Sequence, residues 1–310
     1  MPKKKQKNIA DYIEPLYMNG LQGRMLRLPP PTGKKREILI VYGHHASIER
    51  MFGMAEFFNR YGGVTLPDMP GFGGMEPFYK IGQKPTLDNL ADYMAAFMKL
   101  RYKRRRVTII ATSFGFLVVT RMLQRYPELV KRVDMLVSFV GFAHRDDFRF
   151  GRRSYWLLRA LTTTASNRLP AWILRHAVFR PSLIRFVYNR QADTNAKLRD
   201  ADKTEQQARI EFEIYLWQCN DVRTQADTGI SLLTIDLCNA QVDLPLYHVG
   251  VEEDRYFDNN VVEQHLNVIY KEVHMMKTPL QAHAPTVIAD AASVAPYIPT
   301  KLRRLLARAP

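Results

Sequence analysis

The sequence contains little cysteine and no long apolar run. Its 310 residues include only Cys219 and Cys238, which excludes a disulfide scaffold or a cysteine-rich zinc module and best fits a reducing, cytoplasmic compartment. A membrane-spanning helix needs about 18 consecutive apolar residues, and no segment approaches that length. The basic residues 1–8 are followed by no apolar segment, so no secretory signal is expected.

Acidic residues are also scarce. The chain has 45 Lys+Arg against 30 Asp+Glu, a formal net charge of +15. Between Arg145 and Arg190 there are ten arginines, no lysine and only two acids, Asp146 and Asp147, so this stretch carries +8 of the +15. Such an excess of positive charge favours binding to an anionic partner, which would be nucleic acid, anionic lipid or an anionic substrate. The alternative is a solvated basic face without a partner.

The remaining composition is that of a globular protein, with 46% hydrophobic and 24% charged residues. Short β-branched runs alternate with segments of helical periodicity. We expect strands over residues 36–42, 64–66, 107–111, 133–142, 244–249 and 272–276. We expect helices over residues 47–61, 87–100, 116–126, 260–270 and 286–292, followed by a basic helical tail. This alternation predicts an α/β fold with a doubly wound, mostly parallel sheet.

The pattern also divides the chain. Residues 1–35 are a polar, basic, proline-containing segment, which we expect to be a lead-in to the fold. Residues 36–143 and 236–310 form the predicted α/β core. Residues 144–235 interrupt the alternation with mostly helical segments. We expect this insertion to be a helical cap over the carboxyl edge of the sheet, where such folds bind ligands.

A candidate nucleophile lies between a predicted strand and a predicted helix. Ala111-Thr112-Ser113-Phe114-Gly115 joins the strand at 107–111 to the helix at 116–126. A sharp turn here would expose the Ser113 hydroxyl at the strand's tip, and it requires small residues two positions before and after. The backbone N–H of Phe114 would lie at the helix N-terminus, where it can stabilise an oxyanion.

Two further loops follow predicted strands. Gly43-His44-His45 ends the first one, and in an acyl-transfer site the backbone N–H of His44 would be the second oxyanion donor. The alternative is an ordinary glycine-terminated strand followed by two loop histidines. Asp68-Met69-Pro70-Gly71-Phe72-Gly73 forms a tight turn after the next strand.

The order of four motifs resembles that of the α/β-hydrolase family. They are a strand followed by Gly-His, D-x-P-G-x-G, small-x-Ser-x-Gly and a late Asp…His pair. The resemblance covers roughly residues 36–143 and 240–300. It departs from the family at Ala111, where the elbow motif usually has glycine, and in the interval from Gly250 to Asp254, which is one residue longer than usual. It implies a triad of Ser113, Asp254 and His283, the last within Gln281-Ala282-His283-Ala284-Pro285.

The resemblance leaves three candidates for the acid of the implied triad. It belongs in the segment from Gly250 to Phe257, and Asp254 is preferred because a short apolar-leaning run follows it, as in the family. Glu253 matches the family's usual interval from the glycine better, and Asp258 is the third candidate. Apart from His44, His45 and His283, the histidines lie at positions 144, 176, 248, 265 and 274 and are expected to be structural.

The resemblance implies a serine hydrolase that cleaves an ester, or a thioester, of a small-molecule acyl substrate through an acyl-enzyme. It requires no cofactor and no metal. Hydrolysis of a C–C bond and acyl transfer use the same triad and remain alternatives, as does a non-catalytic binding protein that retains the fold. A serine at the elbow argues against dehalogenase or epoxide-hydrolase chemistry, because those members of the family use aspartate.

The arginines of the insertion alternate with large apolar residues, which predicts amphipathic helices. One face would roof the acyl pocket and the other would carry the charge. Packing on the core alone is one interpretation. Peripheral contact with an anionic membrane surface, or with an anionic acyl carrier, is the other. No specific nucleic acid is expected, because no recognised binding module accompanies the arginines.

Overall fold

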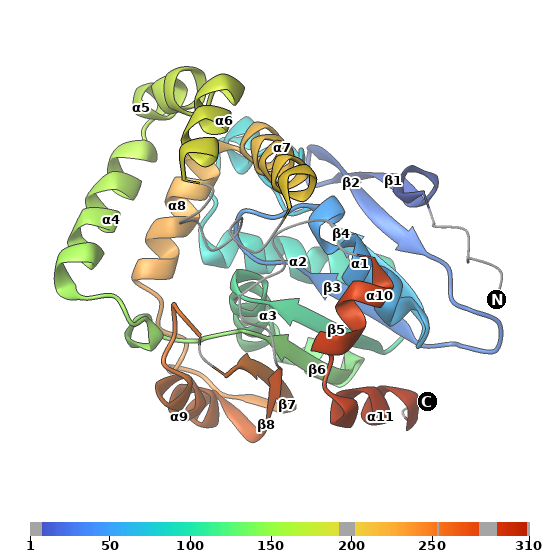
Figure 1. Cartoon of the computed structure of the whole chain (residues 1–310). Helices are drawn as coiled ribbons and strands as arrows, with labels where there is room; N and C mark the ends of the chain where they lie inside the picture. Colours follow the sequence, from blue (N-terminus) through green and yellow to red (C-terminus); the bar gives the residue numbers. More distant parts are fainter. Residues whose placement is uncertain (1–7, 192–201, 253, 279–289, 309–310) are drawn as a thin grey trace.

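An eight-stranded sheet forms the centre of the computed structural model (Figure 1), which describes residues 8–191, 202–252, 254–278 and 290–308. The strand order is β1-β2-β4-β3-β5-β6-β7-β8. The strands are β1 (Ile13–Met18), β2 (Leu21–Leu28), β3 (Glu37–Val41), β4 (Gly63–Pro67), β5 (Val107–Thr112), β6 (Val133–Phe139), β7 (Val242–Val251) and β8 (Tyr270–Thr278). From β4 to β8 all neighbouring strands are parallel.

Helices α1 (Ile48–Asn59), α2 (Leu87–Tyr102), α3 (Phe114–Arg125) and α9 (Asn259–Ile269) connect parallel strands. Helices α10 (Ala291–Val294) and α11 (Thr300–Arg308) follow the last strand. Helices α2 and α3 pack together, and α1 packs against α10. The predicted doubly wound, mostly parallel sheet is therefore confirmed. All residues of the central strand β5 are buried, because helices cover both faces of a parallel sheet.

The N-terminal segment differs from the expected lead-in. Residues 1–35 contain strands β1 and β2, an antiparallel hairpin whose second strand pairs with β4. Asn19 and Gly20 connect the two strands, and both have positive φ angles, 53° and 77°. An Asn-Gly dipeptide is the preferred two-residue hairpin turn, and this signal was overlooked among the polar residues. Leu26 and Leu28 of β2 face the core, so the hairpin is part of the fold.

The predicted insertion between β6 and β7 is helical. Its helices are α4 (Arg152–Ala165), α5 (Arg168–Ile173), α6 (Pro181–Arg190), α7 (Lys203–Cys219) and α8 (Val222–Leu233). They lie to one side of the sheet, with α8 and α7 nearer the core and α4, α5 and α6 outside them (Figure 1). Among the described residues, no helix is both long and apolar enough to cross a membrane.

Candidate active site

Ser113 occupies a sharp turn between β5 and α3. Its backbone has φ 47° and ψ −120°, a strained conformation for a residue with a side chain. The turn is held from the next strand, because the N–H of Ser113 donates to the carbonyl of Phe139 (2.9 Å), and the Ser113 carbonyl accepts from Phe116 (3.0 Å). The strand–turn–helix predicted around Ser113 is therefore present.

The neighbouring small residues are explained by close backbone approach. A Cβ atom on Gly115 would lie 2.4 Å from the carbonyl oxygens of both Val41 and Tyr42, so only glycine fits at this second position of α3. Ala111 is completely buried in β5. Phe114 is the first residue of α3, so its N–H is among those that the helix itself cannot satisfy.

The loop after β3 lies against the same serine. A Cβ atom on Gly43 would be 3.1 Å from the Cβ of Ser113, which places His44 next to the turn. The His44 ring packs edge-on against Phe72 and Phe114. The structure thus brings together Ser113, Phe114 and His44, three of the predicted site residues.

The His44 side chain is anchored by the insertion. Its Nε2 lies 3.0 Å from the Thr228 hydroxyl and 3.2 Å from the Gln225 carbonyl, both on α8. Burial, together with the neighbouring His45, lowers the pKa of His44 to about 4, so the ring is neutral at pH 7. The ring therefore acts as an anchor for the loop, and the backbone of His44 is the part near Ser113.

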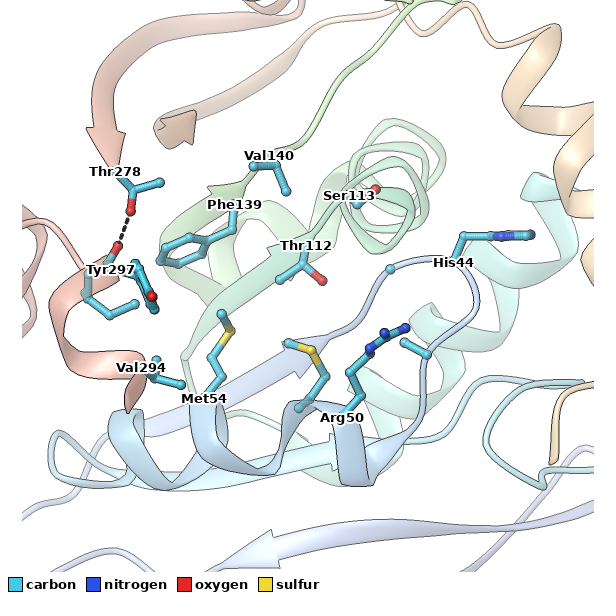
Figure 2. Close-up of a pocket in the computed structure, with 14 residues that line it drawn as sticks. His44, Arg50, Met54, Thr112, Ser113, Phe139, Val140, Thr278, Val294 and Tyr297 are labelled. Atoms are coloured by element: carbon cyan, nitrogen blue, oxygen red, sulfur yellow. Dashed lines mark hydrogen bonds between the residues drawn. The ribbon is translucent and has the colours of Figure 1, made fainter. Parts of the chain in front are cut away.

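A cavity of about 100 Å³ opens beside Ser113 (Figure 2). Most of its wall is apolar and comes from α1, from the end of β6 and from the C-terminal helices. These apolar residues are Met51, Met54, Phe139, Val140, Val294 and Ile298. Polar groups of the wall include Thr112, Thr278 and Arg50. Such a cavity accommodates an apolar group attached to a carbonyl at Ser113.

Arg50 is the only cation among the described residues that line this cavity, and its charge is paired. Its Nη2 donates to Glu213 Oε1 on α7 (2.8 Å), and its Nη1 donates to the carbonyl of His45 (3.1 Å). Glu213 is almost completely buried. Sequence reasoning missed this pair, although an acid between the apolar residues Ile210 and Ile214 of α7 was a usable signal.

Asp254 follows β7 and is buried. Its Oδ1 accepts hydrogen bonds from the backbone N–H groups of Tyr256 (2.8 Å) and Phe257 (3.2 Å), which fix the carboxylate in the loop. Asp258, the third candidate acid, instead caps α9 by accepting from Asn260 and Val261. Glu253 lies outside the described residues.

His283 also lies outside the described residues. The chain on both sides of its segment, however, reaches the cavity. Thr278 at the end of β8 lines the cavity, as do Val294 and Tyr297. The Thr278 hydroxyl donates to the Tyr297 carbonyl (2.7 Å), which joins the two sides (Figure 2).

The Asp68 turn is structural. Asp68 is completely buried, and its carboxylate accepts from the Tyr42 hydroxyl (2.8 Å), the Ile48 N–H (3.2 Å) and Arg24 Nε (2.8 Å). Burial raises the pKa of Asp68 to about 7, against the lowering effect of Arg24. These bonds tie the end of β4 to the ends of β3 and α1, so the turn shapes the edge on which the site is built.

Two of the histidines expected to be structural have packing roles. His248 is buried in β7, with Nδ1 3.1 Å from the Ser138 hydroxyl, and burial lowers its pKa to about 4. His265 Nδ1 lies 2.5 Å from Asp147 Oδ1, which links α9 to the start of the insertion.

The fold agrees with comparisons against known proteins. The family model for the alpha/beta hydrolase fold matches residues 38–265. The chain belongs to the α/β-hydrolase family. No curated protein sequence matches this chain.

Solved structures of this family are similar over almost the whole chain. The enol-lactonase from Burkholderia xenovorans LB400 is 14% identical, with a TM-score of 0.63 and coverage of 94% of this chain and 99% of that one. A thermophilic esterase from Thermogutta terrifontis is 14% identical, with a TM-score of 0.60 and coverage of 95% and 96%. The epoxide hydrolase CorEH is 12% identical, with a TM-score of 0.64 and coverage of 92% and 95%. At such low identity these hydrolases establish the fold, and the individual reaction must be argued from the site.

Proposed function

We propose that this hydrolase is a serine esterase that cleaves a carboxylic ester of a small-molecule acyl substrate through an acyl-enzyme. The observation that carries the proposal is the strained backbone of Ser113, at the tip of β5 and beside an apolar cavity. Strain at a non-glycine residue persists only where the surroundings enforce it, and it is typical of catalytic residues. A hydroxyl in this position is the nucleophile of an α/β-hydrolase.

In the proposed mechanism, His283 removes the proton of the Ser113 hydroxyl as the oxygen attacks the ester carbonyl. Asp254 orients His283 and stabilises the imidazolium. The N–H groups of Phe114 and His44 donate to the oxyanion of the tetrahedral intermediate. His283 then protonates the leaving alcohol, and water, activated by the same histidine, releases the acid.

Two structural facts support Asp254 and His283 as partners. Asp254 is a buried carboxylate held by two backbone N–H groups on the loop after β7, where the family has its acid. Described residues on both sides of the segment with His283 line the Ser113 cavity, Thr278 before it and Val294 and Tyr297 after it. Asp258 is less suited, because its carboxylate already caps α9.

The cavity also bears on the substrate. Its limited volume and apolar wall favour a short, uncharged acyl group. Helices α7 and α8 contact His45, Arg50 and His44 at its edge, so we propose that the insertion is a cap that contributes to selectivity. We expect kcat/KM to be higher for p-nitrophenyl acetate and butyrate than for the octanoate.

Hydrolysis of p-nitrophenyl butyrate by matched variants tests the proposal. We expect Ser113→Ala to lower kcat about 10⁴-fold or more, and Asp254→Asn about 10³-fold or more. The controls are Ser154→Ala, an exposed serine on α4, and Asp258→Asn, because asparagine caps a helix as well as aspartate. Both controls should retain wild-type activity. Equal activity of Asp254→Asn and wild type, with loss in Asp258→Asn, would reassign the acid.

A further inference from the structure

The apolar side of α4 faces away from the protein. Trp156, Leu157 and Leu161 are 55%, 61% and 57% exposed. The opposite side of the helix packs on α8, where a Cβ atom on Gly229 would meet Thr162 at 3.0 Å. A surface helix ordinarily does the reverse and turns its apolar side to the core. Packing against the core therefore does not explain why these residues of α4 are apolar.

The same arrangement continues along α5 and α6. Ile184 of α6 is buried against Ile210 and Ile214 of α7, while its neighbours Leu183, Phe186 and Val187 are exposed. Large exposed residues of α5 are Leu169, Trp172 and Ile173. Helices α4, α5 and α6 form the outermost layer on this side of the molecule (Figure 1). We call the exposed apolar and arginine side chains of these three helices the outer face.

The charge of the outer face has one sign. Residues 148–190 contain no Asp or Glu. Arg185 pairs with Glu211 of α7, and Arg175 donates to backbone carbonyls of residues 217 and 218, so these two arginines hold the insertion together. Five other arginines are exposed and form no ion pair with any described residue. They are Arg152, Arg153, Arg168, Arg180 and Arg190.

We propose that the outer face binds the surface of an anionic lipid membrane. Large apolar side chains among cations, without acids, are the composition of interfacial helices, whose apolar side enters the acyl boundary while arginines contact phosphate headgroups. Self-association is a poorer fit, because a second copy would bring the same arginines against one another without compensating carboxylates. An apolar patch this extensive on the described surface marks an interaction site.

The placement relates the membrane to the hydrolase site. Helix α4 packs on α8, and α8 also holds the His44 ring through Thr228 and Gln225. A membrane bound to α4 thus lies one helix layer from the loop beside Ser113. Membrane binding through these surface residues does not depend on ester hydrolysis, so it can be measured without an enzymatic assay.

Flotation of the full-length protein with vesicles tests the electrostatic part. Vesicles of phosphatidylcholine alone are compared with vesicles containing 30% phosphatidylglycerol, at low and high salt. We expect binding to the anionic vesicles that weakens with salt. The triple variant Arg152→Gln/Arg153→Gln/Arg168→Gln should lower the partition coefficient about tenfold or more. The control Lys34→Gln/Lys35→Gln/Arg104→Gln removes three exposed charges elsewhere and should bind like wild type.

The apolar part is tested with Leu157→Ser/Leu161→Ser. Both side chains point into solvent, so the double variant should fold and bind the anionic vesicles several-fold more weakly. Leu100→Ser/Val268→Ser, which changes two exposed apolar residues outside the insertion, should bind like wild type.

Tryptophan fluorescence locates the contact. Trp217 is stacked on Phe179, whereas Trp156 and Trp172 belong to the outer face. In Trp217→Phe, anionic vesicles should shift the emission to the blue, and brominated lipids should quench it.

Three results would overturn the proposal. The first is no binding to anionic vesicles at low salt. The second is equal, salt-insensitive binding to neutral vesicles. The third is a dimer in sedimentation velocity, or a complex with an acidic acyl carrier protein, that Leu157→Ser/Leu161→Ser abolishes while vesicles are not bound.

Discussion

At the scale of single residues, the site depends on a few positions where no other side chain fits. Ser113 could be identified from the sequence because the required turn restricts its neighbours to small residues. At position 115, for example, a Cβ atom would collide with two backbone carbonyls. The roles of Asp68 and His248 could not be identified in the same way. Both are polar residues whose environment is created by elements distant in sequence, among them Arg24 for Asp68 and Ser138 for His248.

His248 predicts a loss of stability in acid. Its pKa is near 6.5 when the chain is unfolded and about 4 in the fold, so folding favours the neutral ring. This contribution to stability is complete above pH 6.5 and is lost as the pH falls toward 4. This difference in the pKa of His248 corresponds to about 3 kcal/mol in the free energy of unfolding. In urea unfolding, wild type should lose about that much relative to His248→Gln between pH 7 and 4. A parallel pH dependence of the two proteins would contradict this.

At the scale of elements, the parallel strands were predictable and the hairpin was overlooked. Strands β3 to β6 are short apolar or β-branched runs that stop at glycine, proline or polar residues, and a buried parallel strand has this local signature. In β1 and β2 only Met18, Leu21, Leu26 and Leu28 are buried, among polar and proline residues, so the stronger signal was the turn at Asn19-Gly20.

Contacts between elements were not predictable. Arg50 on α1 and Glu213 on α7 are 163 residues apart in sequence, and their ion pair exists only because the insertion folds back onto the loop after β3. Nothing local in either helix specifies the partner. The same holds for the bond between His44 and Thr228.

The Arg50–Glu213 pair is expected to contribute to the free energy of unfolding by holding the insertion to the core. Glu213→Gln leaves a buried guanidinium without its carboxylate, and we expect it to lower the free energy of unfolding by about 3 kcal/mol. The matched control is Glu211→Gln, whose pair with Arg185 is exposed and should contribute less than about 1 kcal/mol. The double variant Arg50→Met/Glu213→Leu should recover most of the loss. If Glu213→Gln and Glu211→Gln lowered the free energy of unfolding in urea equally, the Arg50–Glu213 pair would not hold the insertion to the core as proposed.

At the scale of the whole molecule, the net charge of +15 is unevenly distributed. The sequence located most of its excess between Arg145 and Arg190, and the structure separates those arginines by role. Some hold the insertion together through Glu211 and backbone carbonyls, while others are exposed on the outer face. We propose that the chemistry takes place away from this face, at Ser113 on the carboxyl edge of the sheet.

Covalent labelling tests the central claim, that Ser113 is the nucleophile, most directly. Wild type, Ser113→Ala and Ser154→Ala are treated with a fluorophosphonate, and the site of modification is mapped by mass spectrometry. We expect one adduct on wild type and on Ser154→Ala, at Ser113, and none on Ser113→Ala. The absence of an adduct from the wild-type protein together with no ester hydrolysis, or an adduct that persists in Ser113→Ala, would contradict the account.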